Sequence, residues 1–126
     1  MAVNEIARLT LQRTLKPLLP AKWRFAPSQQ STDRLSTPVV KLQATNIVRP
    51  AGAGRGVVAI QFTASIYAPP STTQTQEDAI DDEVLELIGA IERAGLSWGE
   101  ALKTIDPNRA NLAWEINNIQ VTASLV

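Results

Sequence analysis

The chain has 126 residues, a formal net charge of zero, and neither histidine nor cysteine. The missing cysteines exclude disulfide frameworks, thiolate zinc sites and cysteine nucleophiles, and the missing histidines exclude the commonest general base and transition-metal ligand. A net charge of zero argues against a dedicated nucleic-acid-binding domain, because such domains are generally basic. No apolar run approaches the roughly 20 residues that a membrane-spanning helix needs, so we expect one soluble domain over residues 1–126, with neither a signal peptide nor a membrane anchor.

The first part of the chain predicts a helix followed by a short strand. Between Asn4 and Lys16 apolar residues recur at helical spacing, and the prolines that follow end the helix. From Lys22 to Ala26 aromatic residues alternate with charged ones, as in a half-buried strand. Residues 27–37 are rich in Ser, Gln and Thr, and we interpret them as a flexible loop.

Two alternating segments, residues 40–45 and 58–66, predict an antiparallel hairpin with one apolar face on each strand. The segment between them, residues 49–56, is rich in Gly and Pro and too long for a two-residue turn, so it predicts a long flexible tip. Its glycines do not indicate a phosphate loop, because the segment leads into a strand at Val57 rather than into a helix. Arg49 and Arg55 remain candidates for contact with a partner or with nucleic acid.

A second helix is predicted after Pro69 and Pro70. Thr75 and Asp78 resemble a capping box at its start, and Gly95 suits the position just beyond its end. Apolar residues at helical spacing form a complete stripe along it, as expected for a helix on a sheet. The stripe, the apolar face of the second hairpin strand and one tryptophan make up the predicted core: Val58, Ile60, Phe62, Ile80, Val84, Leu87, Ile88, Ile91 and Trp114.

The last third of the chain predicts two strands, residues 98–105 and 111–124, joined by a turn at residues 106–108. The apolar alternation of the final strand changes phase between Ile116 and Ile119, which indicates a β-bulge at Asn117 and Asn118. The order of helix, three strands, helix and two strands predicts an α+β domain, with a mostly antiparallel sheet of about four to five strands and two helices packed on it.

The second helix also carries the strongest candidate for chemistry, a group of six carboxylates: Glu77, Asp78, Asp81, Asp82, Glu83 and Glu86. Such a group is able to hold Mg²⁺ or Ca²⁺ or to act as an acid and base pair. The favoured interpretation is a solvated or partner-facing helix surface, because acidic residues near a helix N-terminus are stabilised by its dipole. The three tryptophans, Trp23, Trp98 and Trp114, are interpreted as core residues, with a stacking surface or an interface as the alternative. We therefore predict no enzymatic activity, metal or cofactor.

The charges divide between the two halves of the chain. Residues 1–55 hold nine basic side chains against Glu5 and Asp33, and residues 56–126 hold ten acidic ones against three basic ones, so the halves carry about +7 and −7. These charges either pair inside one fold or meet between subunits, and the pattern leaves both possibilities open. The residues proposed for a subunit or partner interface are Arg49, Arg55, Asp78, Asp81 and Asp82.

Five segments together resemble the tail terminator proteins of long-tailed, siphovirus-type bacteriophages, especially those of actinobacteria: residues 19–25 (LPAKWRF), 37–50 (TPVVKLQATNIVRP), 57–69 (VVAIQFTASIYAP), 77–92 (EDAIDDEVLELIGAIE) and 96–121 (LSWGEALKTID…NLAWEINNIQV). The resemblance covers nearly the whole chain in the order of its elements, and it includes no catalytic motif.

The resemblance implies a structural virion protein that forms a ring, usually a hexamer, at the head-proximal end of the tail. Such a ring caps the tail tube, ends its elongation and joins it to the head connector or stopper, after assembly in the host cytoplasm. Its implied partners are other copies of the chain, the major tail tube protein and the connector, and genome DNA passes through without sequence-specific binding. The alternatives are a head-completion or stopper protein of the neck, or a small non-viral ligand-binding domain or enzyme.

Overall fold

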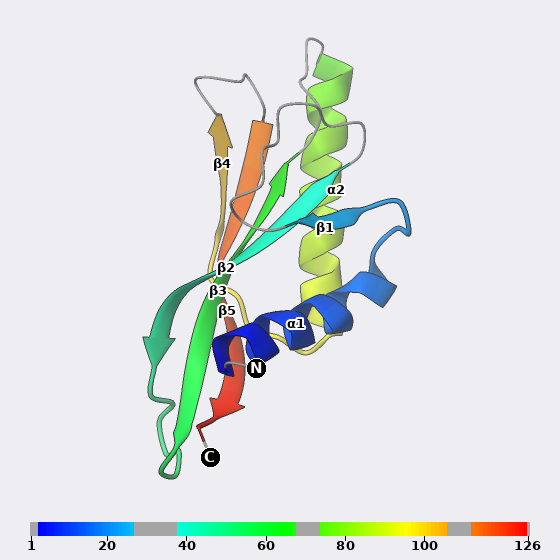
Figure 1. The fold of residues 1–126 in the computed structure, drawn as a ribbon. Coiled ribbons are helices and arrows are strands. Elements are labelled where there is room, and N and C mark those ends of the chain that lie inside the picture. Colours follow the sequence, from blue (N-terminus) through cyan, green and yellow to red (C-terminus); the bar gives the residue numbers. More distant parts are fainter. Residues whose placement is uncertain (1–2, 27–37, 68–73, 106–111, 126) are drawn as a thin grey trace.

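A computed structural model describes residues 3–26, 38–67, 74–105 and 112–125 of the chain (Figure 1). Its five strands form one sheet in the order β1-β2-β3-β5-β4, in which β1 is parallel to β2 and the other neighbours are antiparallel. The predicted α+β class, with two helices on a mostly antiparallel sheet, is confirmed. The elements are α1 (Val3–Leu15), a 3₁₀ turn (Lys16–Leu18), β1 (Arg24–Ala26), β2 (Val39–Val48), β3 (Val57–Tyr67), α2 (Gln74–Arg93), β4 (Ala101–Ile105) and β5 (Leu112–Ser124).

Both helices pack on the same face of the sheet, here called the helix face, and the core lies between them and that face. The alternation along β3 explains the arrangement, because every second side chain from Ile60 to Ile66 points to the helix face and is buried. Most of the predicted core residues are buried, and Val58, Ile88 and Trp114 lie partly buried at its margin. A hydrogen bond also links α2 to the 3₁₀ turn that follows α1, since Nη2 of Arg93 donates to the carbonyl of Leu18 at 3.0 Å.

Two β-bulges face the same short stretch of β3 from opposite sides. On β5 the register shifts across Asn117 and Asn118, the latter with a φ of 58°, and this bulge confirms the prediction from the phase change. On β2 the register shifts around Thr45, which the sequence did not predict. The bulges divide the sheet. Below them lies a part built of three strands, here called the distal half: residues 46–48 of β2, 57–61 of β3 and 119–124 of β5.

The termini of α2 differ in how well they match the predictions. The helix begins at Gln74, so Thr75 lies within its first turn, and the prediction of Thr75 as the capping residue is wrong. Its C-terminal end follows the prediction, because Gly95 has a φ of 73°. The amide of Gly95 donates to the carbonyl of Glu92 at 3.0 Å, and that of Leu96 to Ile91 at 3.1 Å.

The connecting segments are only partly described. The predicted hairpin tip, residues 49–56, joins β2 to β3 and turns at Gly52 and Gly56, which have φ values of 75° and 77°. The predicted strand over residues 98–105 is shorter, since β4 begins at Ala101, and the first strand begins at Arg24, where pairing with β2 begins. The predicted loop at residues 27–37, the prolines at 69 and 70 and the turn at 106–108 lie outside the described residues.

Candidate functional site

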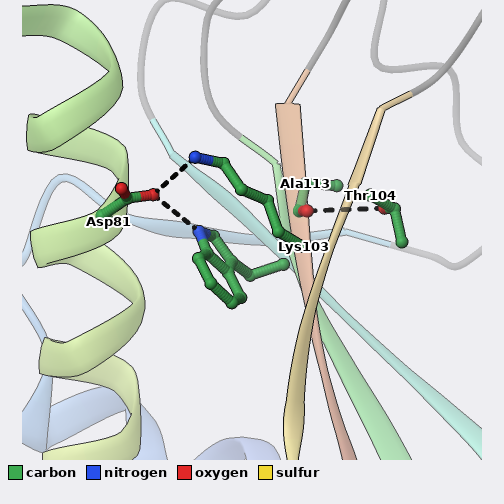
Figure 2. Close-up of polar contacts among 5 residues, drawn as sticks. Asp81, Lys103, Thr104 and Ala113 are labelled. Carbon is green, nitrogen blue, oxygen red and sulfur yellow. Dashed lines mark hydrogen bonds and ion pairs between the residues drawn. The ribbon is translucent and has the colours of Figure 1, made fainter. Parts of the chain in front are cut away.

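The most connected polar cluster joins α2 to the β4–β5 edge of the sheet through Asp81 (Figure 2). Its Oδ1 accepts a hydrogen bond from Nε1 of Trp114 at 3.1 Å and lies 3.0 Å from Nζ of Lys103. Lys103 and Trp114 are cross-strand neighbours on the helix face, and the ammonium lies 5.7 Å from the indole ring. Thr104, on the other face of β4, donates to the carbonyl of Ala113 at 3.4 Å.

This arrangement makes Asp81 an anchor of the fold. Its side chain is 40% exposed and that of Lys103 26%, so the ion pair is half-shielded from water. A second tryptophan holds the other end of the helix, because Nε1 of Trp98 donates to Oε1 of Glu92 at 2.8 Å. Two indole N–H groups thus hold α2, one in its first half and one in its last turn, while Trp23 is buried in the core. These two hydrogen bonds were not predicted from the sequence. A half-buried indole N–H usually needs an acceptor, and the carboxylates of α2 supply one for each tryptophan.

Glu83 on α2 is a carboxylate that is partly shielded from water. Burial raises the pKa of Glu83, the positive charge of Lys22 partly opposes that shift, and the neighbouring Glu86 adds to it. Oε2 of Glu83 is buried and has no hydrogen-bond partner among the described residues. The Lys22 interaction is one place where a charge of the basic half acts on the acidic half within one molecule.

The other predicted interface residues lie at opposite ends of the molecule. Arg49 and Arg55 are exposed on the β2–β3 tip, and Asp78 and Asp82 are exposed in the first half of α2. Figure 1 places the tip and the start of α2 at the two ends of the long axis of the domain, with α1 crossing the sheet between them. The structure therefore does not bring the two groups together, and it uses Asp81 inside the fold.

A further surface, which sequence reasoning missed, lies on the distal half of the sheet. Ile47 on β2 and Ile6 on α1 are exposed there, at 62% and 47%. A groove of about 250 Å³ separates the first turns of α1 from the end of β5. Ile47 was missed because the bulge around Thr45 was not predicted. Without the extra residue of that bulge, Ile47 would point to the opposite face of the sheet.

Within the described residues, no three acidic side chains gather closely enough to hold a metal ion, and neither helix has the length and apolar character to span a bilayer. Comparison of the chain with models of known protein families and with curated proteins finds no match.

Proposed function

We propose that this chain is a structural subunit of a siphovirus-type tail, a tail terminator that assembles into a hexameric ring, as in the family it resembles, and performs no catalysis. The ring would lie in the virion at the head-proximal end of the tail, after assembly in the host cytoplasm. It would contact the tail tube protein on one side and the head connector or stopper on the other.

The observation that carries the proposal is the separation of unlike charges along the domain. Arg49 and Arg55 are exposed on the β2–β3 tip, and Asp78 and Asp82 are exposed in the first half of α2. The tip and the start of α2 lie at opposite ends of the domain (Figure 1), so charges on these two segments do not pair within a subunit. A subunit with a basic end and an acidic end is suited to meet two different neighbours, one above and one below the ring. Complementary charges at such contacts fix orientation and partner choice more than they add affinity.

Charge reversal tests the two ends separately. The double variant Arg49→Glu, Arg55→Glu and the double variant Asp78→Lys, Asp82→Lys should each form rings but lose attachment at one end only. Arg13→Glu is the matched control, because Arg13 is an exposed arginine of α1 away from both ends. The wild-type attachment should also weaken as salt rises from 0.1 M to 1 M, where the screening length falls from about 10 Å to about 3 Å.

The measurements are electron microscopy of the purified full chain, of its mixture with tail tubes, and of virions with the protein labelled by an antibody fragment. Rings that cap one end of the tube, with the label at the head-proximal end of the tail, are expected. A label between the head and the terminator would instead identify a stopper of the neck. A protein that forms no ring alone or on tubes would refute the proposal.

A further inference from the structure

Two strand edges in the distal half of the sheet have no neighbouring strand among the described residues. β1 pairs with β2 only from Val39 to Lys41, and β4 pairs with β5 only from Leu112 to Ile116. Two further backbone hydrogen bonds, from Gly99 and to Glu100, extend the contact as far as Asn117. Beyond those points each edge presents backbone N–H and C=O groups that another extended strand can pair with. On β2 the amide of Ile47 donates to Oδ1 of its neighbour Asn46 at 3.1 Å, a side-chain contact that an incoming strand would replace.

The side chains beside the two open edges are mainly apolar. On the β2 edge Ile47 projects from the helix face and is largely exposed. On the β5 edge the groove beside α1 offers mainly apolar walls. Residues from both faces of β5 line it, so the groove follows the edge of the strand itself; its lining is Val3, Ile6, Ala7, Thr10, Val121, Thr122, Ala123 and Ser124.

We infer that the open edge of β2 pairs with the open edge of β5 in a second copy of this chain, and that Ile47 enters the groove between α1 and β5 of that copy. The inference rests on the proposed ring, for which it names the contact between neighbouring subunits. Each subunit carries one edge of each kind, so the contact is head-to-tail and repeats around the ring until it closes.

The direction of the strands agrees with this junction. β2 and β5 are both antiparallel to β3, and they are therefore parallel to each other in one subunit. A rotation about an axis along the strands preserves their direction, so β2 of one copy runs parallel to β5 of the next. Pairing of two β2 edges would require a two-fold axis and an antiparallel arrangement, and it would leave the groove of both copies empty.

The internal register also predicts which residues meet. Ile47 is paired with Ile60, and Ile60 with Val121, so these three side chains form one row across the helix face. The rotation that relates neighbouring subunits of a ring does not move them along the ring axis. If the strands run along that axis, residues of one row stay level, and Ile47 of the second copy lies beside Val121. A polar row on the opposite face continues in the same way, since Nδ2 of Asn46 donates to Oε1 of Gln61 at 3.0 Å and Gln61 is paired with Gln120.

Disulfide trapping tests the junction directly, because the native chain contains no cysteine. Neighbouring strands lie about 4.8 Å apart, within the Cα separations of roughly 4.4–6.8 Å that a disulfide spans. The double variant Ile47→Cys, Val121→Cys should give, on oxidation, a ladder of covalent oligomers that ends at the closed ring. A melting temperature in reducing buffer checks that the variant folds. If it does not, Asn46→Cys with Gln120→Cys replaces it, because these two residues share the adjacent row on the opposite face of the sheet.

Two controls set the specificity of the trap. Ile47→Cys with Gln120→Cys places the second thiol on the opposite face of the same strand, and it should give at least tenfold less cross-linked product. Leu85→Cys places one thiol on α2 at 63% exposure, nearly that of Ile47, and reports random collision. A ladder with Val121→Cys that exceeds both controls supports the inference. A strong dimer from Ile47→Cys alone, or no product above the controls, overturns it.

The failure of this inference is distinguishable from failure of the proposed function. Rings on tail tubes without the Ile47–Val121 cross-link would leave the tail terminator proposal intact and refute this junction. A cross-linked ladder in a protein that never binds tubes or virions would support the junction and refute the tail function.

Discussion

Replacing Asp81 tests whether the carboxylate anchors α2 to the sheet. Asp81→Ala removes the acceptor for the Trp114 indole and the partner of Lys103, at 3.1 Å and 3.0 Å respectively. A hydrogen bond to a charged group contributes about 1.5–3 kcal/mol, and the half-exposed geometry favours the lower end of that range. The partly exposed ion pair adds at most about 1 kcal/mol. We therefore expect Asp81→Ala to lower the free energy of unfolding by about 2 kcal/mol.

Chemical denaturation and a double-mutant cycle measure this effect. Asp81→Asn keeps an oxygen that accepts from Trp114, and it should lose only about 1 kcal/mol. Combining Asp81→Ala with Trp114→Phe should show a coupling of about 1 kcal/mol, because both changes remove the same hydrogen bond. Asp82→Ala is the matched control, since Asp82 is the adjacent exposed carboxylate, and surface changes of that kind stay within about 0.5 kcal/mol.

Two results would refute this reasoning. Asp81→Ala with the stability of the wild type would mean that Asp81 does not hold the helix. A large loss in Asp82→Ala as well would mean that the effect belongs to the general charge of α2. Charge reversal at the two positions should also have different effects. Asp81→Lys is expected to lower the melting temperature of the isolated subunit, and Asp82→Lys is not.

Two other substitutions test local features of the fold. Gly99→Ala should lower the free energy of unfolding by about 1–2 kcal/mol in denaturation experiments. The added methyl group would meet the side chains of the β5 bulge and displace the Asn117 oxygen that accepts from the amide of Glu100 at 2.9 Å. Wild-type stability in this variant would contradict the reasoning. Glu83→Gln should raise the melting temperature at neutral pH, because burial raises the pKa of Glu83 and disfavours its charged form; the gain should be small, because solvent screens a side chain that is only partly buried. That gain should shrink as the pH falls through the raised pKa and vanish below the ordinary pKa of a glutamate, where the carboxyl is protonated in both the folded and the unfolded state. Melting curves between acidic and neutral pH measure it, Glu86→Gln is the exposed control, and a gain that persists in acid would exclude this cause.

The sequence was a good guide to features that depend on local periodicity. Alternation along β3 and the stripe along α2 identified which side chains face each other, because a pleated strand and a helix each repeat at a fixed period. The bulge on β5 was predictable for the same reason, since apolar residues on both sides of it revealed the change of phase. On β2 the bulge was missed because beyond Ala44 too few apolar residues remain to establish a second phase.

Features that join distant segments were not predictable in this way. The parallel pairing of β1 with β2 depends on three residue pairs across a long connection. Asp81 was assigned to a solvated or partner-facing surface, because the helix dipole alone explains an acidic residue there. Its partners lie on β4 and β5, and only the order of strands in the sheet places them beside α2. For the candidate interface, composition indicated unlike charges but could not locate them at opposite ends of the fold.

The two bulges give a physical reason why folding and assembly can depend on different residues. Above them, five strands and α2 surround the buried side chains, and losing one of those contacts lowers the stability of the single subunit. Below them, the outer edges of β2 and β5 carry exposed side chains such as Ile47. Replacing such a side chain should change the stability of the single subunit little. Bulges also increase local twist, which turns the distal edges away from the plane of the upper sheet. A substitution at these edges should therefore weaken association while the subunit keeps its stability. A substitution at Asp81 should instead lower the stability of the subunit without acting on the contact between subunits.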